Sequence, residues 1–465
     1  MTGPAPESAP LTHPAEVPRS SASQLPANMG SDPVFRGSLL LWPVIRATRA
    51  FRVYVVEPEV YSPNQHAKIF NAALTALITP ESSLVDTLMR SQPAAGVENF
   101  DLITFPEAFL PQDALLEVLL RMSHLSSFGC VHVGLRPSTS EQHLFRVEEL
   151  RALVGLISDI PKVDRHDLDN FSRWLGDQNG ERHFNVGCIF TVDASGAIRV
   201  CLHPKLVRSK FEISPLHESH MSEADLLTLI TLLPANKSYL SVTLQPLLCS
   251  DALSLDTDRA EPAPLEAVNA NAGCFGDMPP DHVDIVSVAT CTPQPEQGTQ
   301  AGDRYRSWHQ EFCDSFRRAA VAGVLSRHHY STFVLANYRT IPGPLPGGLS
   351  GAFIPVPLRR AKHPEFVSIS SWGSVRSSPP TNNSWSVPQR GVVAPENWSS
   401  LGYMASLDPF ALESNNSAYM LGFTIQRLPR DTTRWRETDG FVDFQLRTAT
   451  YRADAETLFF QQQEV

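Results

Sequence analysis

The chain has 465 residues, of which 42% are hydrophobic and 19% charged, and its formal net charge is −11. This length is enough for a large buried core, and the composition is that of an ordinary soluble globular protein. The chain is acidic and has no cluster of lysine and arginine residues that could bind a phosphate backbone, so we expect no nucleic-acid partner. The seven cysteines are widely spaced and form no CxxC pair, which indicates reduced thiols in a cytoplasmic protein.

The N-terminal segment, residues 1–34, is rich in proline, alanine and serine and poor in large apolar side chains. Such a segment cannot bury enough surface to offset the entropy of ordering, so we predict disorder there and structure from about Gly37. The first apolar run, 39–45, is interrupted by Pro43, and no later run approaches the roughly 20 apolar residues of a transmembrane helix. We therefore expect a soluble cytoplasmic protein that does not contact a membrane.

The next part of the chain alternates strand and helix patterns, which is typical of an α/β protein. Short apolar runs predict strands at 51–56, 101–105 and 130–135. Helical spacing of apolar residues predicts a helix over 71–90, broken at Pro80, and another after Asp113, which we expect to cap it. Glu107 follows Pro106 just beyond the second strand, and active residues of α/β folds often lie at such strand ends.

The middle of the chain contains a predicted hairpin. Residues 136–182 come before it and are interpreted as an insertion beside the core. Two strands, at 185–192 and 197–202, are joined by Asp193-Ala-Ser-Gly196, a favourable hairpin turn. The leucine-rich run at 221–233 is predicted to be a short amphipathic helix.

The remaining elements surround an apolar run that ends at Cys249. Beyond it we predict strands at 284–289, 332–336 and 422–426, a loop over 256–282 and a long helix over 304–325. Pro246 lies inside the strand that leads to Cys249, and proline lacks the N–H that a ladder needs. We therefore expect that strand at a sheet edge or at a bulge. Residues 358–465 are interpreted as a C-terminal extension that packs on the core or on an assembly interface.

A thiol, a carboxyl and an ammonium group make a candidate nucleophilic site: Cys249, Glu107 and Lys205. A thiol with a pKa of about 8.5 is only slightly ionised at neutral pH, so it needs a base and a nearby cation. Glu107 can accept the proton of the thiol, and Lys205 can stabilise both the thiolate and the oxyanion that follows. The backbone N–H of Ser250 can be a second oxyanion donor.

Four motifs around these residues resemble those of the nitrilase superfamily of carbon–nitrogen hydrolases, in the same order. They are FPEAF at 105–109, HPKL at 203–206 after the DASG hairpin, LLCSD at 247–251, and VLANYR at 334–339 with GGLSGAF at 347–353. The resemblance implies a carbon–nitrogen hydrolase domain over 37–357. It also implies a four-layer α-β-β-α sandwich that assembles into homo-oligomers.

For the site, the resemblance implies a Glu-Lys-Cys triad with Glu107 as base, Lys205 as oxyanion stabiliser and Cys249 as nucleophile. The family has a second glutamate after the lysine, for which Glu212 is the first choice and Glu218 the alternative. The implied reaction is acyl transfer through a cysteine-bound intermediate. The implied substrate is a small amide or N-carbamoyl compound rather than a nitrile. No cofactor or metal is expected.

Other interpretations of the same residues stay open. A nitrilase-type fold with long insertions can be a binding or sensing module with little or no catalysis. Cys249 can alternatively pair with His183 or His203, which would make a Cys-His hydrolase. The other cysteines are interpreted as core residues. The HESH stretch at 217–220 lacks the spacing of a metal site, and the GGLSG turn lacks the lysine of a phosphate loop.

Overall fold

The computed structural model describes part of the chain, and all of that part belongs to one compact unit, Phe35–Val465. The described residues are 35–44, 50–78, 100–125, 128–138, 143–209, 221–234, 241–253, 264–270, 272–277, 279–292, 312, 315–316, 319, 327–328, 331–341, 345–346, 350–353, 384–386, 418–426, 442–445, 448–452 and 457–461. The prediction of disorder for 1–34 lies outside these residues, as does most of the predicted helix at 304–325. None of the described helices is long and apolar enough to cross a membrane.

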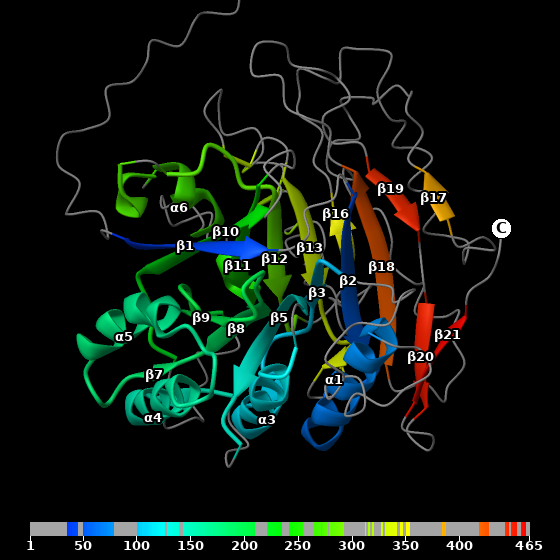
Figure 1. The fold of residues 1–465 in the computed structure, drawn as a ribbon, viewed down its shortest axis with the longest axis horizontal. Helices are drawn as coiled ribbons and strands as arrows, with labels where there is room; N and C mark the ends of the chain where they lie inside the picture. Colours follow the sequence, from blue (N-terminus) through cyan, green and yellow to red (C-terminus); the bar gives the residue numbers. More distant parts are fainter. Residues whose placement is uncertain are drawn as a thin grey trace, which may run out of the picture. The chain divides into compact units, whose positions relative to one another are not determined.

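The first of two large sheets has six strands. Their order across the sheet is β1 (Arg36–Val44), β10 (Leu226–Pro234), β11 (Val242–Leu248), β12 (Ile285–Ala289), β13 (Thr332–Ala336) and β16 (Gly351–Phe353). The β1–β10, β11–β12 and β12–β13 pairs are parallel, whereas β10–β11 and β13–β16 are antiparallel. Strands β1 and β16, which are far apart in the sequence, therefore form the two edges of this sheet. Strand β11, which leads to Cys249, lies inside it (Figure 1).

The second sheet has eleven strands and includes the strand before Glu107. Its main path is β17 (Ser384–Ser386), β19 (Val442–Gln445), β18 (Ala418–Gln426), β2 (Ala50–Pro58), β3 (Leu102–Thr104), β5 (Phe128–Arg136), β8 (Val186–Val192) and β9 (Ile198–Pro204). Off this path, β20 (Thr448–Arg452) pairs with β18 and β21 (Thr457–Gln461), and β4 (Leu110–Pro111) pairs with β5. Two short pairs complete the described strands: β6 (Phe145–Arg146) with β7 (His183–Phe184), and β14 (Thr340–Ile341) with β15 (Leu345–Pro346).

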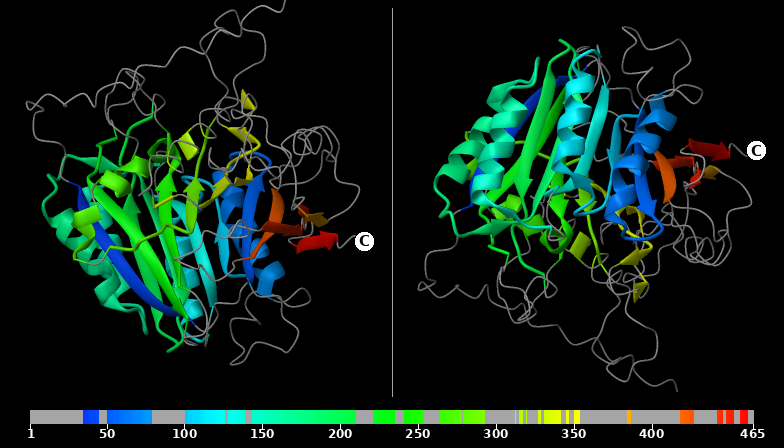
Figure 2. Two further views of the ribbon diagram at one scale, coloured as in Figure 1. Left: turned by 90° about the horizontal axis from the view of Figure 1, so that it is seen from above. Right: turned by 90° about the horizontal axis from the view of Figure 1, so that it is seen from below.

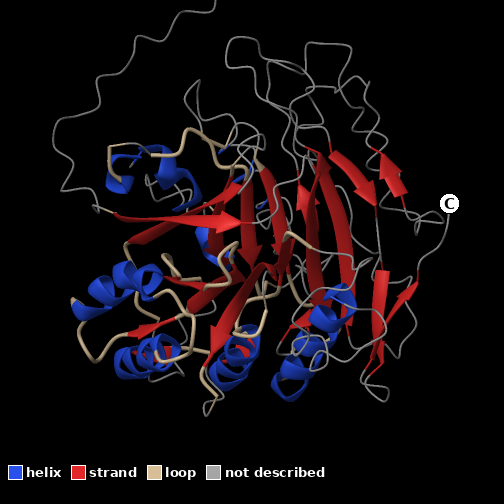
Figure 3. Cartoon of the chain, in the orientation of Figure 1, coloured by secondary structure: helices blue, strands red, loops and turns tan. Residues whose placement is uncertain are grey.

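The two large sheets pack face to face. One buried cluster combines side chains of the six-stranded sheet with side chains of the eleven-stranded sheet, among them Trp42, Ile230, Val53, Leu102 and Ile189. On the other face of the eleven-stranded sheet lie α1 (Pro63–Ile78), α3 (Gln112–Met122), α4 (Val147–Ser158) and α5 (Asp169–Gly176) (Figure 2). Buried side chains of α6 (Pro264–Ala270) pack on the other face of the six-stranded sheet. The protein is therefore a mixed α/β structure with several sheets (Figure 3).

Most of the predicted strands are present. Those at 51–56, 101–105, 130–135, 284–289, 332–336 and 422–426 correspond to β2, β3, β5, β12, β13 and β18. The hairpin prediction is also confirmed: β8 and β9 are antiparallel, with Gly196 at φ 80° in the turn. The carboxylate of Asp193 accepts hydrogen bonds from the backbone N–H groups of Ser195 and Ala197, which closes the turn.

The predicted helix at 221–233 is wrong, because this run forms strand β10. Residues 226–232 are buried without interruption, since one face of β10 meets the inter-sheet core and the other packs toward α6. A strand buried on both faces is a continuous apolar run, and its sequence has no alternation that distinguishes it from a helix.

Three further boundaries differ from the predictions. Helix α1 begins at Pro63, eight residues before the predicted start, and the part of the prediction beyond Ile78 lies outside the described residues. Asp113 lies in the first turn of α3, whose cap residue is Pro111, with no side-chain cap. The predicted loop at 256–282 contains α6 and a 3-10 turn at Ala272–Phe275.

Pro246 lies in an interior strand, so the expected sheet edge or bulge is wrong. The register of β11 with β12 continues through Pro246 without a shift. The carbonyl of Thr243 accepts from the N–H of Asp284 on the β12 side, and backbone groups of alternate residues point to opposite sides. The backbone of Pro246 therefore faces β10, where the paired register has already ended at Leu244. The missing N–H removes no ladder bond.

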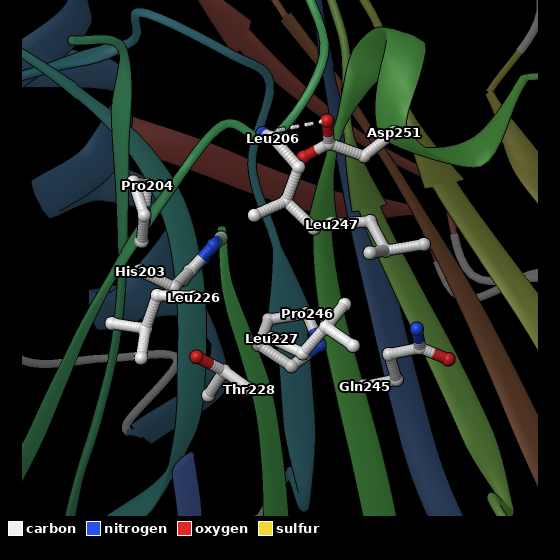
Figure 4. A pocket seen from close by; sticks show the side chains of 10 residues that line it. All are labelled: His203, Pro204, Leu206, Leu226, Leu227, Thr228, Gln245, Pro246, Leu247 and Asp251. Atoms are coloured by element: carbon white, nitrogen blue, oxygen red, sulfur yellow. Dashed lines mark hydrogen bonds between the residues drawn. The ribbon is translucent and has the colours of Figure 1, made fainter. Parts of the chain in front are cut away.

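Beyond Leu244, strands β10 and β11 separate around a small cavity, which Figure 4 shows with its lining residues. The cavity has a volume of about 10 Å³, close to the roughly 10 Å³ that one buried water molecule requires. Two of the lining groups, Thr228 Oγ1 and Gln245 Nε2, are buried and have no hydrogen-bond partner among the described residues. Asp251, which lies two residues after Cys249, also lines the cavity. The cavity therefore reaches the turn that follows the candidate nucleophile.

Candidate active site

Glu107 lies in the loop between β3 and β4, and hydrogen bonds to β5 hold this loop on both sides. The N–H of Gly134 donates to the carbonyl of Pro106 at 3.1 Å, and the N–H of Phe109 donates to the carbonyl of Gly134 at 2.9 Å. The residue after Glu107 is Ala108, whose φ of 52° is in the left-handed region, where residues other than glycine are uncommon. The Glu107 side chain is therefore positioned by a backbone that is fixed before and after it.

The close approach of this loop to β5 requires glycine at position 134. A Cβ there would lie 2.5 Å from both Glu107 Cα and Ala108 N. We expect Gly134→Ala to lower the free energy of unfolding by about 1–3 kcal/mol, because the loop cannot move without losing its bonds to β5. Urea denaturation measures this. Gly155→Ala in α4 is the control, because its Cβ would meet nothing within 4 Å. Equal stability of the two variants would contradict this packing.

Lys205 follows directly after β9 and forms a buried ion pair with Glu107. Its Nζ lies 2.8 Å from Glu107 Oε1, and the two side chains are 1% and 6% exposed. Removing two charges from water costs free energy unless each finds a close partner of opposite charge and further hydrogen bonds. The structure therefore brings together the base and the cation that the sequence analysis proposed, although they are 98 positions apart.

Asn185 supports this pair from both sides. Its Nδ2 donates to Glu107 Oε1 at 2.7 Å, and its backbone carbonyl accepts from the N–H of Lys205 at 2.8 Å. Asn185 was not among the predicted site residues, although the predicted hairpin contained the signal. Val186 pairs with Pro204 in the antiparallel register of β8 and β9. One residue beyond this pair, away from the turn, Asn185 is therefore opposite Lys205.

The other oxygen and the backbone of Glu107 are held from the ends of β12 and β13. The N–H of Cys291 donates to Glu107 Oε2 at 3.2 Å, and the hydroxyl of Tyr338 donates to the backbone carbonyl of Glu107 at 2.9 Å. Both carboxylate oxygens therefore accept hydrogen bonds, which fixes the orientation of the side chain. Burial raises the pKa of Tyr338 well above its ordinary value, so its hydroxyl keeps its proton and remains a donor.

Cys249 occupies the first position of a 3-10 turn, Cys249–Ala252, directly after β11. Its φ is 43°, so Cys249 adopts the left-handed backbone conformation, which is uncommon for residues other than glycine. Conformations of this kind cost free energy and persist where surrounding structure enforces them, often at functional sites. The side chain is 5% exposed, and Sγ lies 3.6 Å from Thr292 Oγ1.

Asp251 connects the Cys249 turn to the loop that carries Lys205. One carboxylate oxygen accepts from the N–H groups of Leu206 and Val207 at 2.8 and 2.9 Å, and the other accepts from Leu248 N–H at 3.3 Å. Burial raises the pKa of Asp251 to about 8, while the charge of Lys205 and the backbone donors act in the opposite direction. This residue, which the sequence analysis did not single out, attaches the thiol-bearing turn to the lysine-bearing loop.

Ser250 lies within the same turn and is fully buried. Its hydroxyl donates to the carbonyl of Val207 at 2.6 Å, a second link from the turn to the Lys205 loop. Its backbone N–H is the group predicted as an oxyanion donor, and that role remains a prediction.

A short segment after β12, residues 290–292, connects the environments of Glu107 and Cys249. The N–H of Glu107 donates to the carbonyl of Thr290 at 3.4 Å, and Cys291 contacts the Glu107 carboxylate as described above. Thr292 contacts the thiol of Cys249. The carboxyl group and the thiol are thus bonded to neighbouring residues of one segment, in which the sequence predicted only Cys291, as a core residue.

The remaining candidates have different positions. Glu212, Glu218 and the HESH stretch lie outside the described residues. His203 is buried, and its Nε2 lies 3.2 Å from His132 Nε2, whose other ring nitrogen contacts Ser287 Oγ at 2.7 Å. Burial lowers the pKa of His203 to about 3, so this imidazole is neutral near pH 7. Among the residues that the structure describes, no group of three or more His, Cys, Asp or Glu side chains could hold a metal ion.

Comparisons with known proteins give a distant structural likeness. No protein-family model matches the sequence, and no curated protein matches it. Among solved structures, the chain is similar to N-terminal amidase, with 9% identity, a TM-score of 0.37 and coverage of 81% of this chain and 99% of that one. N-terminal amidase with an Asn-Glu-Ala peptide is similar at 9% identity and a TM-score of 0.33, over 66% of this chain and 89% of the other.

Proposed function

We propose that the protein is a thiol hydrolase that cleaves a non-peptide carbon–nitrogen bond, with Glu107, Lys205 and Cys249 as a catalytic triad. The observation that carries this proposal is the buried Glu107–Lys205 ion pair, held beside a left-handed cysteine turn by Asp251. A buried base, a buried cation and a thiol at a strained strand end are the parts that acyl transfer through a cysteine requires.

The proposal extends to the fold. The stacked sheets with helices on their outer faces support a four-layer α-β-β-α sandwich of the nitrilase type, with the hydrolase domain over 37–357. Residues 136–182 would be an insertion in it, although α4 and α5 pack into the same core as the eleven-stranded sheet. Residues 358–465 would be an extension, and the working protein a homo-oligomer in the cytoplasm.

In the proposed mechanism, Glu107 takes the proton of the Cys249 thiol, and the thiolate attacks the carbonyl carbon of the substrate. The tetrahedral oxyanion is stabilised by the ammonium group of Lys205 and by the backbone N–H of Ser250. The C–N bond then breaks, and the leaving nitrogen takes the proton from Glu107, so that ammonia or an amine departs. A thioester remains on Cys249. Water, deprotonated by Glu107, attacks this thioester and releases the acid, and Glu107 then returns the proton to the departing thiolate of Cys249.

The proposed substrate is a small amide or N-carbamoyl compound, with a nitrile as the less favoured choice. Attack of the thiolate on an amide or carbamoyl carbonyl group forms a tetrahedral oxyanion. In this proposal Lys205 and the backbone N–H of Ser250 stabilise that oxyanion. Glu212, or alternatively Glu218, would orient the substrate or relay protons. No cofactor or metal takes part in the proposed steps.

The direct test is ammonia release from a panel of primary amides, ureido acids and nitriles. We expect the wild-type protein to hydrolyse at least one amide or ureido acid, with a thioester detectable on Cys249 by mass spectrometry. Cys249→Ala should lose turnover by several orders of magnitude, because no other group of the triad can form the acyl intermediate. Cys274→Ala, which removes a half-buried thiol elsewhere, is the control. Hydrolysis that persists in Cys249→Ala would exclude the triad.

A second function, binding or sensing without catalysis, is favoured by one observation. Cys249, Glu107 and Lys205 are each no more than 5% exposed, so the triad lies beneath the described surface. Alkylation of Cys249 near neutral pH distinguishes the two functions. A hydrolase needs a thiol that reacts faster than a free one, whereas a binding module leaves Cys249 slow and unlabelled.

A further inference from the structure

Thr292 contacts the sulfur that the proposed function makes the nucleophile. The distance between Thr292 Oγ1 and Cys249 Sγ is 3.6 Å, both groups are buried, and either can be the donor. A hydroxyl group donates to a thiolate but accepts from a thiol, so this contact can persist in both protonation states by rotation of one O–H bond.

The hydroxyl of Thr292 is fixed by its neighbours. It forms a hydrogen bond with the hydroxyl of Thr290, two residues earlier and also buried. Its backbone is held at both ends by Asn337, whose Oδ1 accepts from Thr292 N–H at 3.0 Å and whose Nδ2 donates to the Thr292 carbonyl at 3.0 Å. A donor held this firmly loses little entropy when it bonds to a charged sulfur.

Asn337 is itself anchored away from the site. Its N–H donates to Ser350 Oγ at 2.9 Å, and Arg339, two residues on, donates from Nε to Glu57 Oε1 at 3.1 Å. The Thr292 backbone therefore has a support that does not depend on Glu107 or Lys205. A change at Thr292 can be made while the ion pair stays intact.

We propose that Thr292 is a further catalytic residue of this site, whose hydroxyl, supported by that of Thr290, donates a hydrogen bond to the thiolate of Cys249. The inference rests on the proposed function. No proton leaves Thr292: Glu107 takes the thiol proton, and the hydroxyl turns from acceptor to donor as the sulfur becomes charged. The hydrogen bond stabilises the thiolate and aims the sulfur while the cation of Lys205 remains available to the oxyanion.

The test is the pH dependence of Cys249 alkylation by iodoacetamide, followed by peptide mapping, which requires no substrate. Thr292→Val removes the hydroxyl at nearly constant volume, and we expect about tenfold slower alkylation near neutral pH, with the midpoint of thiol ionisation moved to higher pH. Thr292→Ser keeps the hydroxyl and should react like the wild type. Thr290→Val should have a smaller effect in the same direction.

The other titratable groups of the site are the same in all variants, so the difference between the alkylation profiles reports on Thr292. These groups are Glu107, Lys205, Asp251 and Cys291. Thr292→Ala gives the same comparison if the valine variant does not fold. A fast wild-type thiol with an unchanged profile in the valine and alanine variants would overturn the role of Thr292 and leave the proposed function standing. A wild-type Cys249 that titrates like a free thiol would overturn both.

Discussion

Replacing Lys205 with methionine is expected to lower hydrolysis by at least about 10²–10³-fold and the free energy of unfolding by about 3–5 kcal/mol. The stability loss follows from the geometry, since methionine leaves the buried Glu107 carboxylate without its cation. The loss of activity follows because the thiolate and the oxyanion both lose their positive partner. Turnover and urea denaturation measure the two effects separately.

A second variant separates these two consequences. Combining Lys205→Met with Glu107→Gln removes the unpaired charge, so stability should largely return, while activity should remain absent. Lys162→Met, at an exposed lysine, is the control and should change neither quantity. If the single Lys205→Met variant were as stable as the wild type, the ion pair would not be buried as described.

Asp251→Ala is expected to destabilise the protein by about 3–5 kcal/mol, because three buried N–H donors lose their acceptor together. The donors are those of Leu206, Val207 and Leu248. Since the same carboxylate joins the Cys249 turn to the Lys205 loop, the alanine variant should also lose activity. Denaturation and turnover measure both losses, and a variant with wild-type stability would show that the carboxylate does not connect these loops.

Asp251→Asn gives a pH-dependent comparison. The pKa of Asp251 is raised by burial to about 8 in the folded protein, against about 3.9 in an unfolded chain. Its contribution to stability is therefore greatest below about pH 4 and is lost as the pH rises through about 8. Asparagine does not titrate, so the stability difference between wild type and Asp251→Asn should decrease across this range. Denaturation at about pH 5 and about pH 9 checks this, and a constant difference would contradict the raised pKa.

The parts of the fold that the sequence predicted are those with a strong local signal. The strand before Glu107 is soon followed by a proline, and the β8–β9 hairpin has a turn whose aspartate accepts from the backbone N–H of Ser195. Strand β10 has no such signal, because its burial on both faces comes from elements that are distant in sequence. Whether Pro246 removes a ladder hydrogen bond depended on where the pairing of β11 with β10 ends. That point is set by both strands and cannot be predicted from the sequence of β11 alone.

The candidate site divides in the same way. Glu107, Lys205 and Cys249 have side chains whose chemistry is recognisable in a sequence, and each lies just beyond a strand. Asn185 and Thr292 bond to Glu107 and Cys249, and Asp251 bonds to the backbone next to Lys205 and Cys249, so these contacts emerge only when the strands are assembled. Of these, Asn185 was accessible in principle through the hairpin register. Thr292 reaches the thiol because β11 and β12 are parallel neighbours in one sheet, so the residues that follow them lie close together.

The pairing of β2 with β18 has a consequence for how the chain is made. Ala50–Pro58 is antiparallel to Ala418–Gln426, and on its other side β2 is parallel to β3, the strand that leads to Glu107. During synthesis β2 emerges several hundred residues before its outer partner β18. Until then an edge strand next to the base-bearing strand is unpaired, and such edges invite aggregation and slow folding. Strand β18 therefore covers the edge of β2 in the sheet whose strand β3 leads to the proposed base.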